Sequence, residues 1–371
     1  MSRDVPPFRA DHVGSLLRPP ALHAARADFA DGRIDAAQLR ATEDGAINDA
    51  VAMQQTAGLR SATDGEFRRA TWHMDFIYQI GGIGKAPGNI AVKFHNAQGD
   101  IEWTPAAIHV DRKISMEKTI FADHFQYLRS IAGPSVPKLT IPSPNMVHYR
   151  GGPAAIDPAV YPDIEEFWSD LATAYGDEVA RLSDLGCTYL QFDDTSLAYL
   201  NDPAQRAEIA ARGDDAEHLH LRYIKQVNAA LADKPAGMTV TTHLCRGNFQ
   251  SSWAASGGYD YVAEALFGEL AVDGFFLEYD DERSGGFEPL RFVPPGKMVV
   301  LGLVTTKSGA LENPDDVRRR IDQAARYVPL DQLCLSPQCG FSSTVEGNVL
   351  SYEQQVAKLD LIVSVAADVW G

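Results

Sequence analysis

The sequence predicts an α/β protein folded as a (β/α)8 TIM barrel. Three observations support this fold: eight short apolar runs recur along the 371 residues, helical patterns separate most of them, and no linker or shift in composition divides the chain. A doubly wound sheet is the alternative, but no G-x-G-x-x-G motif follows an apolar run. We therefore expect one domain over residues 1–371.

Each predicted strand is an apolar run that ends at a polar or glycine-containing loop. The eight runs cover residues 10–13, 59–63, 137–142, 187–192, 238–243, 273–277, 298–304 and 332–337. Helices are predicted at 24–58 with a break near Asp31-Gly32, and at 121–130, 163–185, 215–231, 259–270, from 313 onward, and 351–369. Two of them carry clear end signals, because Gly186 follows the helix at 163–185 and Pro314 occupies a first turn.

One stretch departs from the alternation of strands and helices. Between Gly81 and Met116 apolar and polar residues alternate, as in A-V-K-F-H-N and A-I-H-V-D-R-K-I-S. This period predicts a β-hairpin excursion at 81–116, inserted after the second strand. Its role as a lid or as a subunit contact stays open, and so does homo-oligomer formation.

The composition excludes several classes of function. A formal net charge of -17 argues against nucleic acid or an anionic membrane surface as the main partner. No stretch approaches the roughly 20 apolar residues of a spanning helix, and the N-terminus lacks the apolar core of a signal peptide, so we expect a cytoplasmic protein. Four cysteines are too few for a disulfide framework, which leaves reduced thiols available to a metal or to catalysis.

Candidate metal ligands stand at the ends of three predicted strands, which face one mouth in a barrel. His243 and Cys245 are two residues apart, so in an extended segment their side chains point to the same side. On its own, such a pair is more often a packed cysteine beside an ordinary loop histidine. With Glu278 and Cys339 it offers one nitrogen, two sulfurs and one oxygen, a set that suits tetrahedral Zn²⁺. A closed stabilising zinc, or none, is the alternative.

Further polar residues end other predicted strands. They are Gly14-Ser15, Asp64, Glu66, Asn145, Asp193, Asp194 and Lys307. For the acidic residues among them, the alternative role is to cap the following helix. This role is favoured more for Asp64 and Asp194 than for Glu66 and Asp193.

A set of motifs along nearly the whole chain carries a family resemblance. They are V-G-S-L-L-R-P, T-D-G-E-F-R-R, I-P-S-P-N, Q-F-D-D, H-L-C-R-G-N-F, L-E-Y-D-D and S-P-Q-C-G-F. On these motifs the chain resembles the catalytic barrel of cobalamin-independent methionine synthase, and more closely the short, single-barrel "methionine synthase II" type proteins. The resemblance implies one Zn²⁺ per chain, held by His243, Cys245, Glu278 and Cys339. It also implies that homocysteine is activated as a zinc thiolate for direct displacement at the methyl carbon of a donor such as 5-methyltetrahydrofolate, giving methionine.

The same resemblance implies how the thiol substrate is held. It places the homocysteine carboxylate on Val13, Gly14 and Ser15, where N–H groups at a strand end can bind an anion. It places the ammonium against Glu66 and Asp193, the two residues expected to act in catalysis. Charge complementarity is consistent with this second assignment.

One departure from the family pattern concerns the proton for the leaving group. The family resemblance implies a histidine at the end of the seventh strand, but here that strand ends V-T-T-K and no histidine follows His243. His12, His73 and His148 lie near strand ends, where packing or a surface position is their alternative role. Lys307 is a candidate for electrostatic assistance. The departure leaves the methyl donor open.

Arginines and aromatic residues follow the predicted mouth loops. The arginines are Arg68, Arg69, Arg246 and Arg283, and the aromatics are Trp72, Phe249 and Trp253. We expect the arginines to form ion pairs with Asp280, Asp281 and Glu282, and the alternative is a substrate-anion site. The aromatics are candidates for stacking on a pterin, although core packing is commoner.

Two alternatives to homocysteine methylation remain. The first keeps zinc and changes the substrates, as in epoxyalkane:coenzyme M transferases, where a sulfonated thiol opens an epoxide. That thiol lacks an ammonium, so Glu66 and Asp193 favour homocysteine, whereas clustered arginines would favour the sulfonate. The second is a non-catalytic zinc-stabilised barrel or a metal-free decarboxylase. In each catalytic reading the partners are small molecules.

Overall fold

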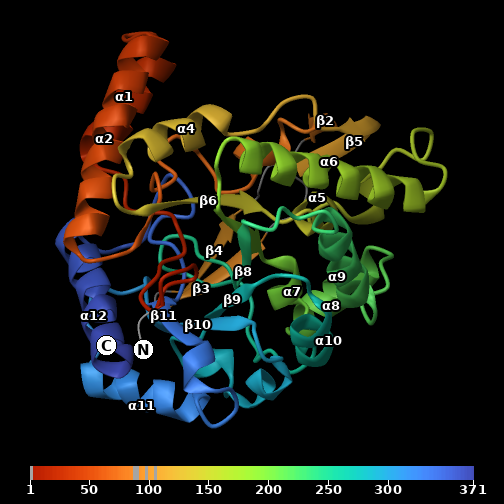
Figure 1. Cartoon of the computed structure of the whole chain (residues 1–371). Helices are drawn as coiled ribbons and strands as arrows, with labels where there is room; N and C mark the ends of the chain where they lie inside the picture. The colour runs from red at the N-terminus through yellow and green to blue at the C-terminus, as the bar shows by residue number, and fades with distance from the viewer. Residues whose placement is uncertain (1–2, 87–91, 97–98, 104–106) are drawn as a thin grey trace.

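A curled parallel sheet with helices packed around it forms the body of the molecule (Figure 1). The computed structural model describes residues 3–86, 92–96, 99–103 and 107–371. Seven strands lie in the order β1-β6-β7-β8-β9-β10-β11, and every neighbouring pair is parallel. They are β1 Ser61–Ala62, β6 Val136–Pro142, β7 Tyr189–Asp194, β8 Thr239–Leu244, β9 Gly274–Glu278, β10 Met298–Val304 and β11 Leu333–Pro337. The α/β barrel class is confirmed.

The predicted first strand, at residues 10–13, is wrong as a regular strand. This segment makes one parallel bridge, Ala10 to Leu335, with N–O distances of 3.0 Å from the Asp11 amide and 2.8 Å to the Arg9 carbonyl. The second predicted run is also shortened, to the two residues of β1. Side-chain hydrogen bonds replace sheet hydrogen bonds at this edge of the barrel, as the Asp11 contacts below show.

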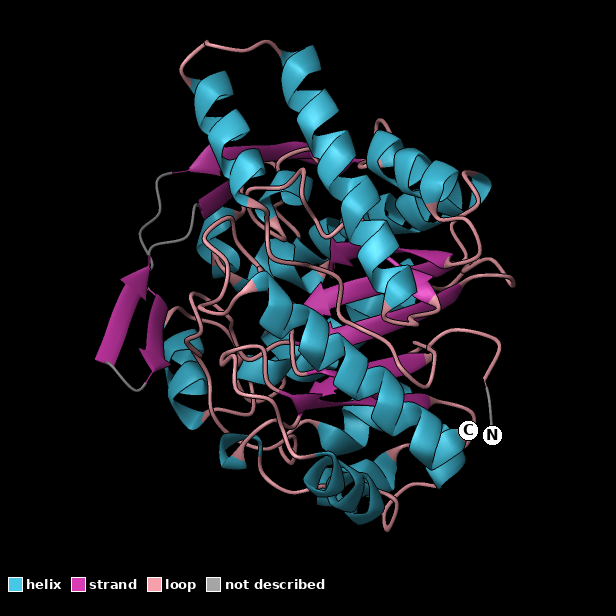
Figure 2. Ribbon diagram, turned by 90° about the vertical axis from the view of Figure 1, so that its left-hand side faces the viewer, coloured by secondary structure: helices cyan, strands magenta, loops and turns pink. Residues whose placement is uncertain are grey.

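The helices follow the predicted pattern with small shifts at their ends. The longer ones are α1 Pro20–Ala30, α2 Ala36–Thr56, α4 Ala122–Ile131, α6 Ile164–Asp184, α8 Pro203–Ala211, α9 Leu219–Ala230, α10 Ala263–Glu269, α11 Pro314–Ala324 and α12 Tyr352–Trp370. The break near Asp31-Gly32 is confirmed, because Asp35 begins α2 with a capping box that pairs it with Gln38. Helices α1 and α2 project together beyond the barrel (Figure 2).

Short helices occupy several of the connections. They are α3 Met74–Ile77, α5 Asn145–Tyr149, α7 Ser196–Tyr199 and the 3-10 turns Gly152–Ala155, Glu282–Ser284, Glu288–Phe292 and Leu330–Gln332. Helices α5 and α7 follow directly after β6 and β7, so they lie close to the strand ends where the site forms. In the part of the chain that the structure describes, no helix is both long enough and apolar enough to cross a membrane.

The excursion after the second strand is confirmed as antiparallel β structure. Strand β2 Gly81–Ala86 pairs with β5 Ala107–Ser115, and β3 Val92–Asn96 pairs with β4 Gly99–Trp103 between them. Residues 87–91, 97–98 and 104–106 of the predicted insertion lie outside the described residues. The β3–β4 ladder stands apart from the barrel sheet (Figure 2) and is bridged to the loop after β8 by His95 and Trp253, with N–O distances of 2.7 and 3.0 Å.

A buried carboxylate fixes the segment at 10–13 in place of strand pairing. Asp11 is 0% exposed and accepts hydrogen bonds from Ser61 Oγ (2.9 Å), from Tyr189 Oη (2.8 Å) and from two backbone N–H groups of its own segment. Lys138 Nζ lies 3.5 Å from its Oδ1, and both side chains are fully buried. Burial lowers the pKa of Lys138, and the Asp11 carboxylate opposes that shift. Asp11 therefore ties the N-terminal segment to β1, β6 and β7.

We expect the Asp11→Ala variant to lose about 3–5 kcal/mol of unfolding free energy, because it leaves the buried Lys138 ammonium without its partner. The measurement is equilibrium unfolding in urea. Asp31→Ala is the matched control, since it removes an exposed partner of Arg33 and should change stability little. Equal losses in the two variants would contradict the anchoring role of Asp11.

Candidate active site

Four potential metal ligands converge at the carboxyl ends of the strands. His243 ends β8, Cys245 follows it, Glu278 ends β9 and Cys339 follows β11. One ligand atom from each lies within 4.8 Å of all the others, and all four residues are buried. The two Sγ atoms are 3.6 Å apart, and His243 Nε2 lies 3.9 Å from Glu278 Oε1. The structure thus brings together the four residues that the sequence predicted as ligands.

The geometry of this group fits a tetrahedral cation. Zn–S bonds of about 2.3 Å at a tetrahedral angle separate two sulfurs by about 3.8 Å, close to the observed 3.6 Å and far beyond the roughly 2.05 Å of a disulfide. Among the described residues, no hydrogen-bond partner reaches the buried Nδ1 and Nε2 of His243 or Oε2 of Glu278. Buried polar atoms are normally satisfied, so these three point to a missing ligand.

The electrostatics of the group also favour a cation. A hydrogen bond from Cys245 holds the pKa of Cys339 well below its usual range, whereas the same contact raises the pKa of Cys245 well above. Burial raises the pKa of Glu278, although Lys307 opposes this shift. Without a cation the three acidic groups cannot all ionise together, and a divalent ion would allow it.

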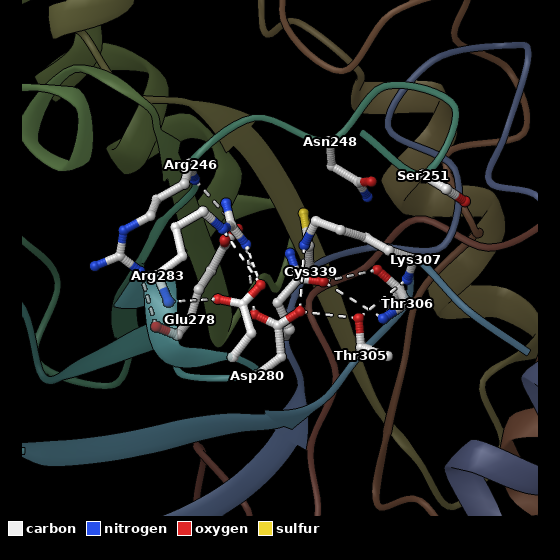
Figure 3. Close-up of polar contacts among 12 residues, drawn as sticks. Arg246, Asn248, Ser251, Glu278, Asp280, Arg283, Thr305, Thr306, Lys307 and Cys339 are labelled. Carbon is white, nitrogen blue, oxygen red and sulfur yellow. Dashed lines mark hydrogen bonds and ion pairs between the residues drawn. The ribbon is translucent and has the colours of Figure 1, made fainter. Parts of the chain in front are cut away.

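The arginines that follow the mouth loops are bound to protein groups. Arg246 donates from its amide to Glu278 Oε1 (3.2 Å) and from its guanidinium to the Glu278 carbonyl (2.8 Å), which orients that ligand. Arg283 lies 3.8 Å from Asp280 and 3.2 Å from Asp281, as expected (Figure 3). Lys307 is also paired with Asp280, at 3.4 Å (Figure 3).

Among the described ion pairs, Arg68, Arg69 and Arg246 do not meet the predicted Asp280, Asp281 or Glu282, so that prediction is wrong for these three arginines. Arg68 pairs with Asp44 and, at 3.5 Å, with Glu43 of α2. Arg69 lies 3.5 Å from Glu66 Oε1 and donates to the Thr140 carbonyl at 2.8 Å. None of the four arginines lines the cavity formed by the described residues, which removes them as a ready-made anion site.

Glu66 and Asp193 line the same cavity as three of the four potential ligands, all except Glu278. Glu66 has φ of 61°, a left-handed conformation that is uncommon for a side chain other than glycine and that is often found at functional sites. Its Oε1 accepts from Thr140 Oγ1 at 2.7 Å, and its buried Oε2 has no partner. Burial and the nearby Glu66 raise the pKa of Asp193 to about 7. The two acids therefore form a buried negative pair that a cationic ligand would stabilise.

Val13, Gly14 and Ser15 form a short segment with unused donors. Their carbonyl groups accept from protein donors, at 2.8, 2.6 and 3.0 Å respectively. Their N–H groups have no acceptor among the residues that the structure describes. Gly14 has φ of 149°, and a Cβ there would lie 2.7 Å from Thr140 Cγ2, so only glycine fits. Val13 and Ser15 line the cavity.

Three other strand-end residues serve local structure. Asp64 Oδ1 accepts the Glu66 amide at 2.9 Å, which holds the turn before that residue. Asp194 Oδ1 accepts the Leu197 amide at 3.0 Å and thereby begins α7, while Asn145 donates to Oδ2 of the same carboxylate at 2.9 Å. The Asp194 contact matches the capping alternative, whereas Asp64 holds a turn and the next described helix, α3, begins only at Met74.

The cavity measures about 590 Å³, a volume that includes space open to solvent, and its lining contains residues that the sequence reasoning missed. They include Phe94, Arg150, Thr195, Tyr199 and Asn248. Phe94 comes from the excursion, and its ring lies 5.4 Å from Phe249. Of the three predicted aromatics, Trp72 and Phe249 line the cavity, whereas Trp253 packs against His95 and Arg283. A hint was available for Arg150 and Tyr199, since both follow predicted strand ends, but neither belonged to a motif.

Comparisons of the sequence and of the structure relate this chain to one protein family. The family model of the cobalamin-independent synthase catalytic domain matches residues 8–368. The chain belongs to this family. It is 49% identical to the uncharacterized protein YxjH of Bacillus subtilis, covering 98% of this chain and 95% of that protein. A crystal structure described as a candidate vitamin-B12-independent methionine synthase from Listeria monocytogenes matches all of both chains, with 38% identity and a TM-score of 0.79.

A more distant relative in the comparison has an informative name. The 5-methyltetrahydropteroyltriglutamate–homocysteine methyltransferase of Mycobacterium leprae is 21% identical, and the match covers 98% of this chain but 43% of that protein. The chain therefore corresponds to less than half of this longer relative.

In this member of the cobalamin-independent synthase family, the three histidines considered as proton donors to the leaving group lie outside the cavity lining. His12, His73 and His148 are buried and do not line it. Burial lowers the pKa of His12 and of His148 to about 4 and that of His73 well below its ordinary value. All three are thus neutral packing histidines at neutral pH, and Lys307 is held by Asp280.

Proposed function

We propose that this chain is a zinc-dependent thiol S-methyltransferase that converts homocysteine to methionine. The observation that carries the proposal is that three of the four clustered residues, His243, Cys245 and Cys339, line the same cavity as Glu66 and Asp193. Membership in the cobalamin-independent synthase family supports it, and so does the name of the M. leprae relative.

His243, Cys245, Glu278 and Cys339 would hold one Zn²⁺, because their N, S and O donors match the preferences of that ion. When bound, zinc lowers the pKa of a substrate thiol so that the sulfur is ionised and nucleophilic at neutral pH. The amide contact from Arg246 and the burial of Glu278 hold that carboxylate in its orientation.

The chain's own residues position the amino-acid end of the substrate. Glu66 and Asp193 would accept the ammonium, whose positive charge offsets the repulsion between the two carboxylates. The free N–H groups of 13–15 would bind the carboxylate. With its ammonium and carboxylate held, the substrate directs its sulfur toward the metal ligands. The remaining requirement for transfer is the position of the methyl donor.

Transfer would follow a direct displacement. The sulfur forms a bond to the methyl carbon while the bond between that carbon and the donor breaks, and the leaving group keeps the electron pair. No enzyme residue becomes methylated. A folate such as 5-methyltetrahydrofolate is a candidate donor, and Trp72 and Phe249 are the aromatic surfaces in the cavity against which a ring system would pack.

The alternative with a sulfonated thiol and an epoxide is disfavoured by the charges of the site. A thiol without an ammonium would leave the buried Asp193 without a cationic partner, whereas Glu66 already lies 3.5 Å from Arg69. Free arginines at the mouth would have favoured a sulfonate. The arginines there are instead bound within the protein, namely Arg68, Arg69, Arg246 and Arg283.

The metal assignment predicts one zinc per chain in purified protein and loss of most of it in His243→Ala and Cys339→Ser. Elemental analysis after dialysis measures the content. Cys187→Ser is the control, because Cys187 is an equally buried thiol outside the cluster. Full zinc retention in Cys339→Ser would show that the cluster is not the metal site.

The ammonium assignment predicts that Glu66→Gln and Asp193→Asn lower kcat/KM for homocysteine by about 10- to 100-fold, the effect expected when a charge-assisted hydrogen bond is removed. Zinc content should not change. The matched substrate is 4-mercaptobutyrate, which is homocysteine without its amino group, with methyl iodide as donor to both thiols. Wild-type protein should prefer homocysteine, and each variant should lose much of that preference. Unchanged preference in both variants would refute the assignment.

A further inference from the structure

One cation in the cavity lacks an anionic partner. Apart from His243, Arg150 is the only basic residue among the described residues that line the cavity. It follows α5 directly and is half-buried, and its Nε is buried without a hydrogen-bond partner. No carboxylate of the described chain lies within 4.0 Å of its guanidinium, unlike Arg68, Arg69 and Arg283. The guanidinium also lies 5.8 Å from the centroid of the Tyr149 ring, a cation–π contact that leaves the Nε–H without an acceptor among the described residues.

Tyr199 places a second unused donor in the same cavity. Its side chain is 1% exposed and its hydroxyl has no hydrogen-bond partner. The ring packs edge-on against Tyr149, the residue before Arg150, at 5.8 Å between centroids. Burial raises the pKa of Tyr199, and the positive charge of Arg150 opposes this shift, so the hydroxyl remains protonated and able to donate.

The hydroxyl of Tyr199 lies next to the metal ligands. A Cβ built on Gly247 would be 2.7 Å from it, and the Gly247 amide donates to Cys245 Sγ at 3.3 Å. The phenol hydroxyl therefore lies beside the backbone turn that follows Cys245. Arg150 and Tyr199 line the same cavity as His243, Cys245 and Cys339.

Two donors without acceptors call for a ligand group that only accepts hydrogen bonds, and a carboxylate fits that requirement. Under the proposed function, on which this inference rests, the homocysteine carboxylate is already assigned to 13–15 and its ammonium to Glu66 and Asp193. The anion at Arg150 must then belong to the other substrate. We propose that Arg150 and Tyr199 form a subsite for a carboxylate of the methyl donor.

The subsite narrows the class of donor. The donor would carry a carboxylate that reaches Arg150 and an apolar part that packs on Phe94, Phe249 and Trp72, which line the same cavity. A folate, with carboxylates on its glutamate tail, and a small carboxylated sulfonium compound share this chemistry. A donor without an anionic group would leave Arg150 uncompensated on binding.

The test measures binding by calorimetry to zinc-loaded protein saturated with homocysteine. The probes are tetrahydrofolate and methylthioacetate, which are the demethylated products of the two donor classes. Methylthioacetamide is the neutral control for the second probe. The proteins are wild type, Arg150→Gln, Tyr199→Phe and Arg222→Gln, the last removing an exposed arginine that pairs with Glu165.

We expect at least one carboxylate probe to bind wild type and to lose about 10- to 100-fold in affinity in Arg150→Gln, with a smaller loss in Tyr199→Phe. Arg222→Gln should bind like wild type, and methylthioacetamide should not distinguish the proteins. Tetrahydrofolate as the responding probe identifies a folate donor, and methylthioacetate identifies a small one. If neither carboxylate distinguishes Arg150→Gln from wild type, the subsite is refuted.

Two further results separate this inference from the proposed function. If Arg150→Gln weakens homocysteine binding instead, the arginine holds the thiol's carboxylate and the donor assignment is wrong. If wild-type zinc protein does not methylate homocysteine with methyl iodide above the uncatalysed rate, the proposed function itself fails, whatever the carboxylate probes show.

Discussion

The parallel register of β7, β8 and β9 is the constraint on which the site depends. Asp193 of β7 lies in register with His243 of β8, and His243 lies in register with Phe276, two residues before Glu278 on β9. Since side chains two residues apart on a strand share a face, this pairing directs the three polar groups to one side of the strand ends. Cys339 arrives from β11, and its sulfur lies 3.6 Å from that of Cys245 although 94 positions separate them in sequence. A slip of one residue would turn these side chains away from the cavity.

Two parts of the site are held without sheet pairing, and both depend on buried polar contacts. The segment at 10–15 is attached through Asp11, which bonds to side chains of β1 and β7 and to Lys138 of β6. Glu66 keeps its left-handed backbone because Asp64 accepts its amide and because its carboxylate is bound by Thr140. Such contacts are direction-specific, so they fix the donors of 13–15 and the acid Glu66 relative to the strands.

The sequence predicted well that His243, Cys245, Glu278 and Cys339 converge, because each ends or follows an apolar run and the barrel places the ends of all such runs together. It predicted a regular strand at 10–13 wrongly, because an apolar run does not reveal that hydrogen bonds to the Asp11 side chain replace the backbone hydrogen bonds of strand pairing there. Arg150 and Tyr199 stand on the short helices after β6 and β7, or next to them, where no motif marks them. Both residues matter because the Arg150 Nε–H and the Tyr199 hydroxyl lack hydrogen-bond partners among the described residues, and only three-dimensional contacts reveal this. The paired arginines illustrate the converse, since Arg68 and Arg246 looked available in the sequence and are bound in the fold.

Charge is divided within the cavity in a way that separates two ligands. The negative side is formed by Glu66 and Asp193, where burial and mutual repulsion raise the pKa of Asp193 to about 7 and favour a cationic partner. The positive side is Arg150, with the hydroxyl of Tyr199 beside it. A zwitterionic thiol can satisfy the first side and the amides of 13–15 without using Arg150. An anionic molecule is repelled by the first side and attracted by the second, so each ligand is disfavoured in the other's position. The residues that we propose as binding groups for the two substrates would therefore also fix where each substrate lies, with the sulfur and the methyl group meeting between them.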